Sequence, residues 1–431
     1  MRKIYETDSY IKEYETVVTA SGKLDDGRYY VELDESIFFP EEGGQNADTG
    51  TLSIVKTGNG KEAGPAAQDM AENIITPEAG ESCIKLTGGI IRRGDAVNDD
   101  LIRYIVDKPV EAGSRVLCRL DWDDRYDRMQ NHSGEHILTG VIHNRYGFDN
   151  VGFHLSDTGF VTLDLNGAIT YEDVIEAEKE ANRAIYANLT IKDCYPAKDE
   201  LKDIDYRSKI DIEGQVRLIV IGGMPDSSYS DCLDVCACCA PHVARTGEIG
   251  IIKVISVINW KGGIRISMLC GRRALEYINK EHDLLTETAR ALSTEAVNVP
   301  SMVEQHKKEI SELKYRVNEI LKQTITDRIM NADGDEMRLV FVDSDYPADI
   351  MKDIYNTLTG KYEGYVGIFA GDDGHGYRYN AGSRDHDSRE LAAGLKERFG
   401  AKGGGSPQMI QGRIGALKEE IREYFNRYCD K

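Results

Sequence analysis

The sequence predicts an α+β protein with several domains. Short runs of alternating polar and apolar residues, bounded by turn residues, fill the first part of the chain and are typical of a small β-barrel. Helix and strand patterns then alternate up to residue 273, and a nearly unbroken helical pattern follows. We expect a barrel-like domain at 1–118, an α+β domain at 119–273, a helical linker at 274–333 and an α/β domain at 334–431.

The N-terminal domain is predicted from strand-like runs at 14–20, 28–33, 104–109 and 114–120. Asp25-Asp26-Gly27 separates the first two runs and is a turn signal. Residues 56–93 differ from the rest, because they are rich in Gly, Ala and Glu and have weak periodicity. We interpret that stretch as an insertion.

The α+β domain begins with a helix over 121–146. Its acidic start at 121–124 offers N-cap side chains, an apolar stripe follows, and Gly147 can end it. Residues 154–165 alternate as one antiparallel strand, and 171–189 form a second amphipathic helix.

The last two parts follow from the same patterns. The helix over 275–331 is interrupted at 298–300, and Ser301 with Glu304 forms a capping box that restarts it. Ile310, Leu313, Val317 and Ile320 follow at coiled-coil spacing. The α/β domain is predicted from strands at 337–342 and 365–370 and from helices at 347–358 and 388–399.

Composition limits the classes of function. The net charge is −21, which disfavours indiscriminate binding of nucleic acid unless the basic residues are segregated. The stretch 250–273 lacks Asp and Glu but contains Lys253, Lys261, Arg265, Arg272 and Arg273, and by charge alone it indicates a basic hairpin, that is, a hairpin whose solvent face is basic. No membrane span or signal peptide is visible, so we expect a cytoplasmic protein whose nine cysteines are kept reduced.

Two His/Cys pairs predict a metal site. His132 and His136 share one face of the predicted helix, and Cys238 and His242 repeat the same spacing about a hundred residues later. Such a donor set suits zinc. Four ligands would leave no open position, so the metal either has a loose ligand, expands its coordination or mainly orients a substrate. Cys239 is an alternative ligand to Cys238.

The same residues carry a family resemblance. The two pairs, with the run Val-Ala-Arg-Thr-Gly-Glu-Ile-Gly after His242, resemble the editing domain of alanyl-tRNA synthetase and of its free-standing relatives, the AlaX proteins. The segment 38–45 and Asp48 resemble the glycine-rich motif that precedes that domain. The segment 402–412 resembles the glycine-rich signature of the DHH-associated domain, which implies tRNA binding by Gly403, Gly404 and Gly405.

This resemblance implies a long AlaX-type hydrolase that removes Ser or Gly from mischarged tRNA(Ala) with Zn²⁺. Ser36 and Gln45 are then expected to sense the serine hydroxyl, and Cys238 to hold the catalytic metal. Glu135, off the histidine face, is expected to be a solvated carboxylate rather than a base. The basic residues of 250–273 are then expected to contact the acceptor end of the tRNA, and the resemblance implies that the helical linker can mediate a homodimer. Two alternatives remain: a non-catalytic tRNA-binding module with structural zinc, and a subunit of a split synthetase.

Overall fold

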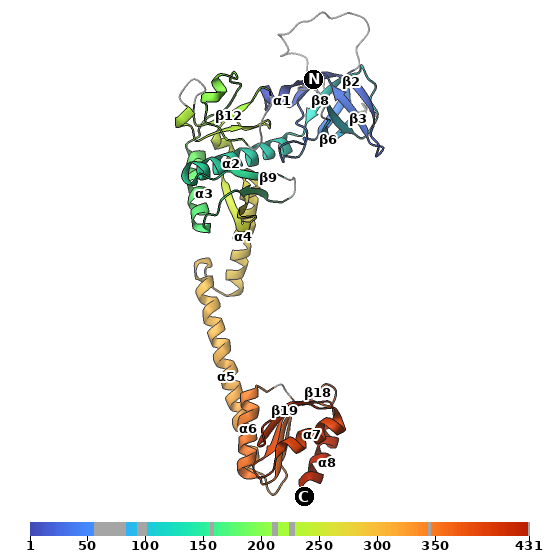
Figure 1. Cartoon of the computed structure of the whole chain (residues 1–431), viewed down its shortest axis with the longest axis vertical. Helices are drawn as coiled ribbons and strands as arrows, with labels where there is room; N and C mark the ends of the chain where they lie inside the picture. Colours follow the sequence, from blue (N-terminus) through green and yellow to red (C-terminus); the bar gives the residue numbers. More distant parts are fainter. Residues whose placement is uncertain are drawn as a thin grey trace, which may run out of the picture. The chain divides into compact units, whose positions relative to one another are not determined.

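The computed structural model describes residues 1–55, 83–92, 101–155, 159–208, 214–223, 229–343 and 346–429. It confirms an α+β protein with an N-terminal barrel (Figure 1). The chain divides into two compact units, Met1–Leu284 and Leu285–Lys431, which are described separately. None of the described helices is long and apolar enough to cross a membrane.

The barrel is closed and has the strand order β2-β3-β7-β6-β5-β8. Its strands are β2 (Glu13–Lys23), β3 (Tyr29–Leu33), β5 (Gly50–Ile54), β6 (Ile84–Arg92), β7 (Leu101–Val106) and β8 (Arg115–Leu120). Alternate side chains of these strands fill the interior, as the period-two pattern predicts. The predicted insertion at 56–93 was therefore too long, because β6 is a strand of the barrel. Its part at 56–82 lies outside the described residues.

Short elements lie beside the barrel. The strands β1 (Arg2–Lys3) and β4 (Glu35–Ser36) pair in parallel, and the helix α1 (Ile4–Thr7) lies between them in sequence. Tyr5 of α1 packs edge-on against Phe39 at a ring distance of 5.5 Å. This contact fixes the start of the glycine-rich motif.

The α+β domain is built around one long helix, α2 (Trp122–Tyr146). Gly147 ends it in the left-handed conformation, as predicted, but Asp121 makes no side-chain capping bond at its start. A four-stranded antiparallel sheet has the order β14-β15-β10-β9, and a three-stranded one the order β11-β12-β13. Their members are β9 (Asn150–His154), β10 (Val161–Leu165), β11 (Ile191–Cys194), β12 (Leu218–Ile221), β13 (Asp234–Ala237), β14 (Ile252–Trp260) and β15 (Gly263–Cys270).

The structure corrects two predictions for this domain. The single strand expected at 154–165 is wrong, because His154 ends β9 and the paired strand β10 starts only at Val161. Helix α3 (Tyr171–Tyr186) ends three residues before the predicted 189. Thr170 caps it by accepting the Asp173 N–H, and the apolar stripe of α3 packs into the common core.

The linker consists of α4 (Gly271–Ala291) and α5 (Val299–Asn331). The predicted break at 298–300 comes too late, since α4 ends at Ala291 and a 3₁₀ turn, η4 (Ala296–Asn298), precedes α5. The predicted capping box is wrong as well: Pro300 lies in the first turn, and the Ser301 hydroxyl donates to the Asn298 carbonyl.

The C-terminal sheet has the order β16-β17-β18-β20-β19. Its strands are β16 (Leu339–Val342), β17 (Tyr365–Asp372), β18 (Gly376–Ser383), β19 (Lys402–Gly405) and β20 (Met409–Ile414), and its helices are α6 (Ala348–Lys361), α7 (Ser388–Phe399) and α8 (Lys418–Cys429). The predicted α/β pattern holds only for β16, α6 and β17, because β16 and β17 pair in parallel whereas the other three strand pairs of the sheet are antiparallel. The glycine run 403–405 belongs to β19, which pairs with β20 at the edge of the sheet.

Candidate metal centre

Both predicted His/Cys pairs meet in one buried cluster. His132 and His136 lie on the same face of α2, and Cys238 and His242 follow β13. One ligand atom from each of the four residues lies within 4.8 Å of the other three. The three imidazoles are almost fully buried. The helical spacing thus places His132 and His136 side by side, and the fold brings Cys238 and His242 to them.

The spacing of these atoms fits a zinc ion. The Cys238 Sγ lies 3.6 Å from the His132 Nε2 and 3.3 Å from the His242 Nε2. Tetrahedral zinc with ordinary bond lengths would separate sulfur and nitrogen ligands by about 3.6 Å. The donor set also matches the thiolate and imidazole ligands that zinc prefers.

Each histidine is oriented by a partner on its other nitrogen. The Nδ1 of His132 is 2.7 Å from the Gln45 Oε1, that of His136 is 3.3 Å from the Asp234 Oδ2, and that of His242 is 3.0 Å from the Ser133 Oγ. These contacts leave all three Nε2 atoms for the metal, which is the arrangement that metal-binding histidines need.

Asp234 and Arg207 were not anticipated from the sequence. Arg207 donates from Nε and Nη2 to the two carboxylate oxygens of Asp234, at 2.8 and 2.9 Å. His136, Asp234 and Cys236 also form a second group that could hold a metal ion. Since Arg207 already neutralises Asp234 with both hydrogen bonds, we assign Asp234 to orienting His136 rather than to a second ion.

The charges of the cluster favour metal binding by Cys238. Burial alone would raise the pKa of Cys238, but the charge and the hydrogen bond of the neighbouring His132 imidazole lower it well below its usual value. Burial lowers the pKa of His242 to about 3, so its ring is neutral at physiological pH. Burial and the Cys238 charge instead raise the pKa of Cys239 well above its usual value. Cys239 is not in the four-residue group.

The glycine-rich motif docks onto β9 and delivers Gln45. The Gly44 carbonyl accepts the Leu155 N–H at 2.8 Å, and Gln45 forms a bridge with Leu155. A Cβ atom on Gly44 would lie 2.2 Å from the Phe153 carbonyl oxygen, and its φ is +85°. Only glycine fits this position, because the two backbones approach so closely. The buried Gln45 Nε2 has no hydrogen-bond partner among the described residues.

A buried ion cluster holds the same motif against α2. Asp48 accepts hydrogen bonds from the Arg125 guanidinium and from the Phe39 N–H, the latter at 2.7 Å. The Arg128 Nη1 lies 3.3 Å from the other Asp48 oxygen. All three charged side chains are buried. This contact connects the barrel to the helix that carries His132 and His136.

Ser36 occupies a different environment from Gln45. Its hydroxyl accepts the Phe38 N–H at 3.1 Å, and it is buried beside Tyr104 in the barrel. In the described contacts, Ser36 therefore supports the backbone of the glycine-rich motif.

The interpretation of Glu135 as a solvated carboxylate was wrong. Glu135 is only 1% exposed, accepts hydrogen bonds from Asn150 and Thr139, and places Oε2 3.9 Å from the His136 Nε2. Helix α2 is buried on almost all sides, so a residue off the histidine face does not reach solvent.

Four of the five predicted RNA-binding cations have acidic partners from other parts of the chain. Lys253 pairs with Glu178, Arg265 with Asp164, and Arg272 and Arg273 with Asp127. Lys261 lies 5.5 Å from the Trp260 ring centre, on which Arg265 also stacks. Carboxylates from elsewhere in the chain thus offset most, but not all, of the positive charge of this stretch.

Comparisons with known proteins point to one family. Residues 216–267 match the family model for the second additional domain of threonyl- and alanyl-tRNA synthetases. The chain is 26% identical to the alanyl-tRNA editing protein AlaX-L of Pyrococcus horikoshii, over 98% of this chain and 96% of that protein. It is also 26% identical to the alanine–tRNA ligases of Ignicoccus hospitalis and Pyrobaculum neutrophilum, over 36% and 44% of their lengths. These matches confirm the resemblance to AlaX-type proteins, and the chain spans less than half of the two ligases.

Proposed function

We propose that this chain, which resembles AlaX-type editing proteins over nearly all of its length, is a zinc-dependent hydrolase that deacylates mischarged Ser-tRNA(Ala) and Gly-tRNA(Ala). The observation that carries the proposal is the buried set of His132, His136, Cys238 and His242, whose three imidazoles are oriented toward one point. Zinc bound there would polarise an ester carbonyl or lower the pKa of a water molecule.

Such an activity would correct errors that arise because a binding pocket for alanine has limited selectivity. A pocket for alanine cannot strongly exclude glycine, which is one methyl group smaller, or serine, which only adds a hydroxyl; discrimination of this kind reaches about a hundredfold. A second site that hydrogen-bonds the serine hydroxyl can reject alanine more strongly, because alanine would leave the buried polar group unpaired.

Gln45 is suited to this recognition. Its Oε1 holds the His132 ring, while its buried Nε2 has no partner among the described residues and can donate to an oxygen of the substrate. Ser36 supports the same motif from the barrel. In this proposal Cys238 holds the metal as a thiolate.

The remaining parts of the proposal concern tRNA and assembly. We assign tRNA contacts to the basic hairpin, where Lys261 has no acidic partner among the described residues, and to the domain that contains Gly403, Gly404 and Gly405. That domain corresponds to the DHH-associated domain of the resemblance. We place the reaction in the cytosol and the homodimer contact on the helical linker.

Release of amino acid from preformed seryl-, glycyl- and alanyl-tRNA(Ala) tests the proposal, with wild type and His132→Ala compared. We expect rapid loss of serine or glycine, slow loss of alanine, and no hydrolysis by the variant. Binding of tRNA with no release from any of the three would favour a non-catalytic module, and copurification of a synthetase catalytic chain would favour a split enzyme.

A further inference from the structure

The segment 238–242, here called the ligand loop, joins two of the four candidate metal ligands and leaves the sheet directly after β13. The Cys238 N–H donates to the Arg217 carbonyl at 3.2 Å, which adds one bond to the pairing of β12 and β13. Residues 239–241 lie outside both strands, and Pro241 has no N–H to donate. Contacts other than strand pairing therefore fix the position of Cys238 relative to His242.

The Arg217 side chain supplies two of these contacts. Its Nη1 donates to the carbonyl oxygens of Cys238 at 3.1 Å and of Ala240 at 2.9 Å. Its Nε donates to the Asp193 Oδ2 of β11 at 3.4 Å, and the Arg217 side chain is only 9% exposed. Hydrogen bonds from a charged donor are stronger than those between neutral groups, so the guanidinium holds the backbone of the ligand loop on both sides of Cys239.

Contacts from α2 hold the other end of the ligand loop. The Ser133 hydroxyl accepts the Val243 N–H at 3.2 Å, and the same oxygen lies 3.0 Å from the His242 Nδ1. Because Ser133 lies on α2 between His132 and His136, this contact places His242 relative to the other two imidazoles. The two ends of the ligand loop are thus held by different parts of the fold.

The middle of the ligand loop packs against the N-terminal part of the chain. Ala240 is buried in a small apolar cluster with Tyr5 and Phe39. Such apolar contacts limit where the loop can move, but they have no preferred direction. The two hydrogen bonds from Arg217 do have a preferred direction, so they fix the orientation of the peptide groups next to Cys238.

An arginine suits this position better than a lysine. A planar guanidinium carries five N–H donors in a fixed arrangement, so the one group bonds two carbonyl groups and a carboxylate at once. A lysine ammonium has three donors, but its flexible stem does not set their directions. We therefore expect that positive charge alone, without the planar group, does not hold the loop.

We propose that Arg217 is a positioning residue of the metal centre, which holds the ligand loop so that the Cys238 sulfur faces the three imidazoles before a metal ion binds. This inference rests on the metal site of the proposed function, and it concerns how that site is built rather than which ester it cleaves. A loop that is already ordered loses little conformational entropy when zinc binds. Without Arg217, ordering of the loop would weaken zinc binding.

Zinc affinity of the full chain, measured under reducing conditions by competition with a chromogenic chelator, tests the proposal. For Arg217→Met, which keeps the stem but has no donor, we expect zinc to bind about 10- to 100-fold more weakly, as for other residues that orient metal ligands. Arg217→Lys should recover only part of this loss. In the cobalt-substituted protein, the sulfur-to-cobalt charge-transfer absorption should weaken in Arg217→Met, because the Cys238 sulfur is no longer held in place.

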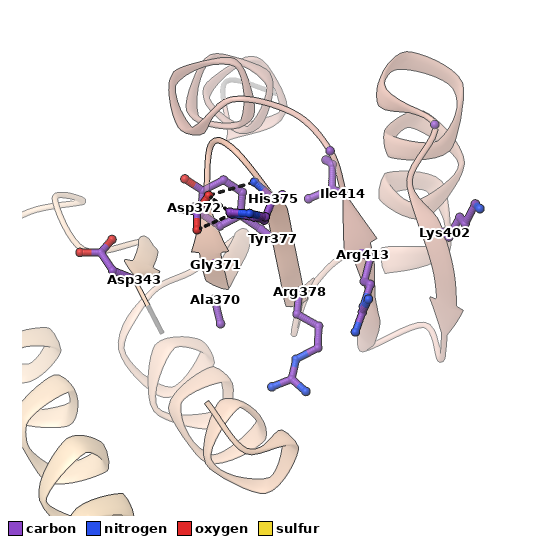
Figure 2. A pocket seen from close by; sticks show the side chains of 13 residues that line it. Asp343, Ala370, Gly371, Asp372, His375, Tyr377, Arg378, Lys402, Arg413 and Ile414 are labelled. Atoms are coloured by element: carbon purple, nitrogen blue, oxygen red, sulfur yellow. Dashed lines mark hydrogen bonds and ion pairs between the residues drawn. The ribbon is translucent and has the colours of Figure 1, made fainter. Parts of the chain in front are cut away.

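Two control variants separate this role from general effects of charge. Asp193→Asn removes a partner of Arg217 but leaves both bonds to the ligand loop. Arg413→Met removes an exposed arginine that lines a cavity of the C-terminal sheet, in the other compact unit (Figure 2). Both variants should bind zinc as tightly as the wild type and keep its cobalt spectrum.

Wild-type zinc affinity with an unchanged cobalt spectrum in Arg217→Met would overturn the proposal, even if urea unfolded that variant more easily, because the arginine would then only stabilise the fold. An equal loss of affinity in Arg413→Met would overturn it as well. If Arg217→Met did not fold, the zinc affinity of Arg217→Lys would decide the same question. None of these measurements requires hydrolysis, so a wild-type chain that binds zinc but cleaves no ester would contradict the proposed function and not the role of Arg217.

Discussion

At the scale of single residues, the candidate metal centre depends on the histidine nitrogens that point away from the cluster. Gln45, Asp234 and Ser133 each hold one Nδ1 and come from three different elements. A histidine without such a partner could rotate or change tautomer, and removal of such partners typically weakens metal binding about 10- to 100-fold. The zinc affinity should therefore be sensitive to residues that never touch the ion.

The two adjacent cysteines give the sharpest test of the ligand assignment. Cys238→Ala should lose bound zinc and hydrolysis, because it removes the only sulfur of the four-residue group. Cys239→Ala should keep both, because that thiol lies outside the group and its raised pKa keeps it protonated. Metal content by mass spectrometry, measured with deacylation, checks this prediction. An equal loss in both variants would contradict it.

Gln45 has two roles that a single variant can separate. Gln45→Met has a similar size but neither supports His132 nor donates from Nε2. We expect kcat/KM to fall for both esters. The fall should be greater for the seryl ester, by on the order of tenfold, because only serine loses a hydrogen bond of about 1–3 kcal/mol. A seryl-to-glycyl ratio of kcat/KM equal to that of the wild type would limit Gln45 to orienting the histidine.

At the scale of elements, the buried Asp48 joins the barrel to α2. Asp48→Asn would leave the buried Arg125 guanidinium without its carboxylate partner, and breaking a buried pair in this way costs about 3–5 kcal/mol. The midpoint of urea unfolding should fall accordingly. Asp26→Asn, which breaks an exposed pair with Arg28, is the control and should change the midpoint little. A similar shift in both variants would contradict the proposed role of the cluster.

The features that could be predicted from the sequence are those that depend on local periodicity. His132 and His136 share a helix face because of their spacing, and Gly147 ends that helix because it adopts positive φ readily. Asp234 was missed because it reaches His136 only after β13 pairs with β12, a contact that no local pattern encodes. Glu135 was misjudged since helical spacing gives the direction of a side chain but not what covers it.

At the scale of the whole molecule, negative charge predominates and many cations are paired with carboxylates. The net charge is −21, and most cations of the basic hairpin are paired with carboxylates. Long-range attraction of an RNA backbone is therefore weak, and the proposed binding of tRNA would have to come from local clusters of cations. Affinity for RNA should depend on a few residues, which makes charge-removing variants at those positions informative.

Exposed apolar side chains on α5 predict that the chain forms a homodimer. Ile310, Leu313, Val317 and Ile320 are 53%, 50%, 53% and 64% exposed, at the spacing of a coiled-coil seam. A row of apolar side chains left in water is typical of an interface, so we expect a homodimer through paired α5 helices. Ile310→Lys/Val317→Lys should reduce the mass measured by light scattering to that of one 48.1 kDa chain, because the seam would carry like charges. Lys308→Glu, outside the seam, should leave the dimer intact, whereas a wild-type chain that is already monomeric would show that α5 does not self-associate.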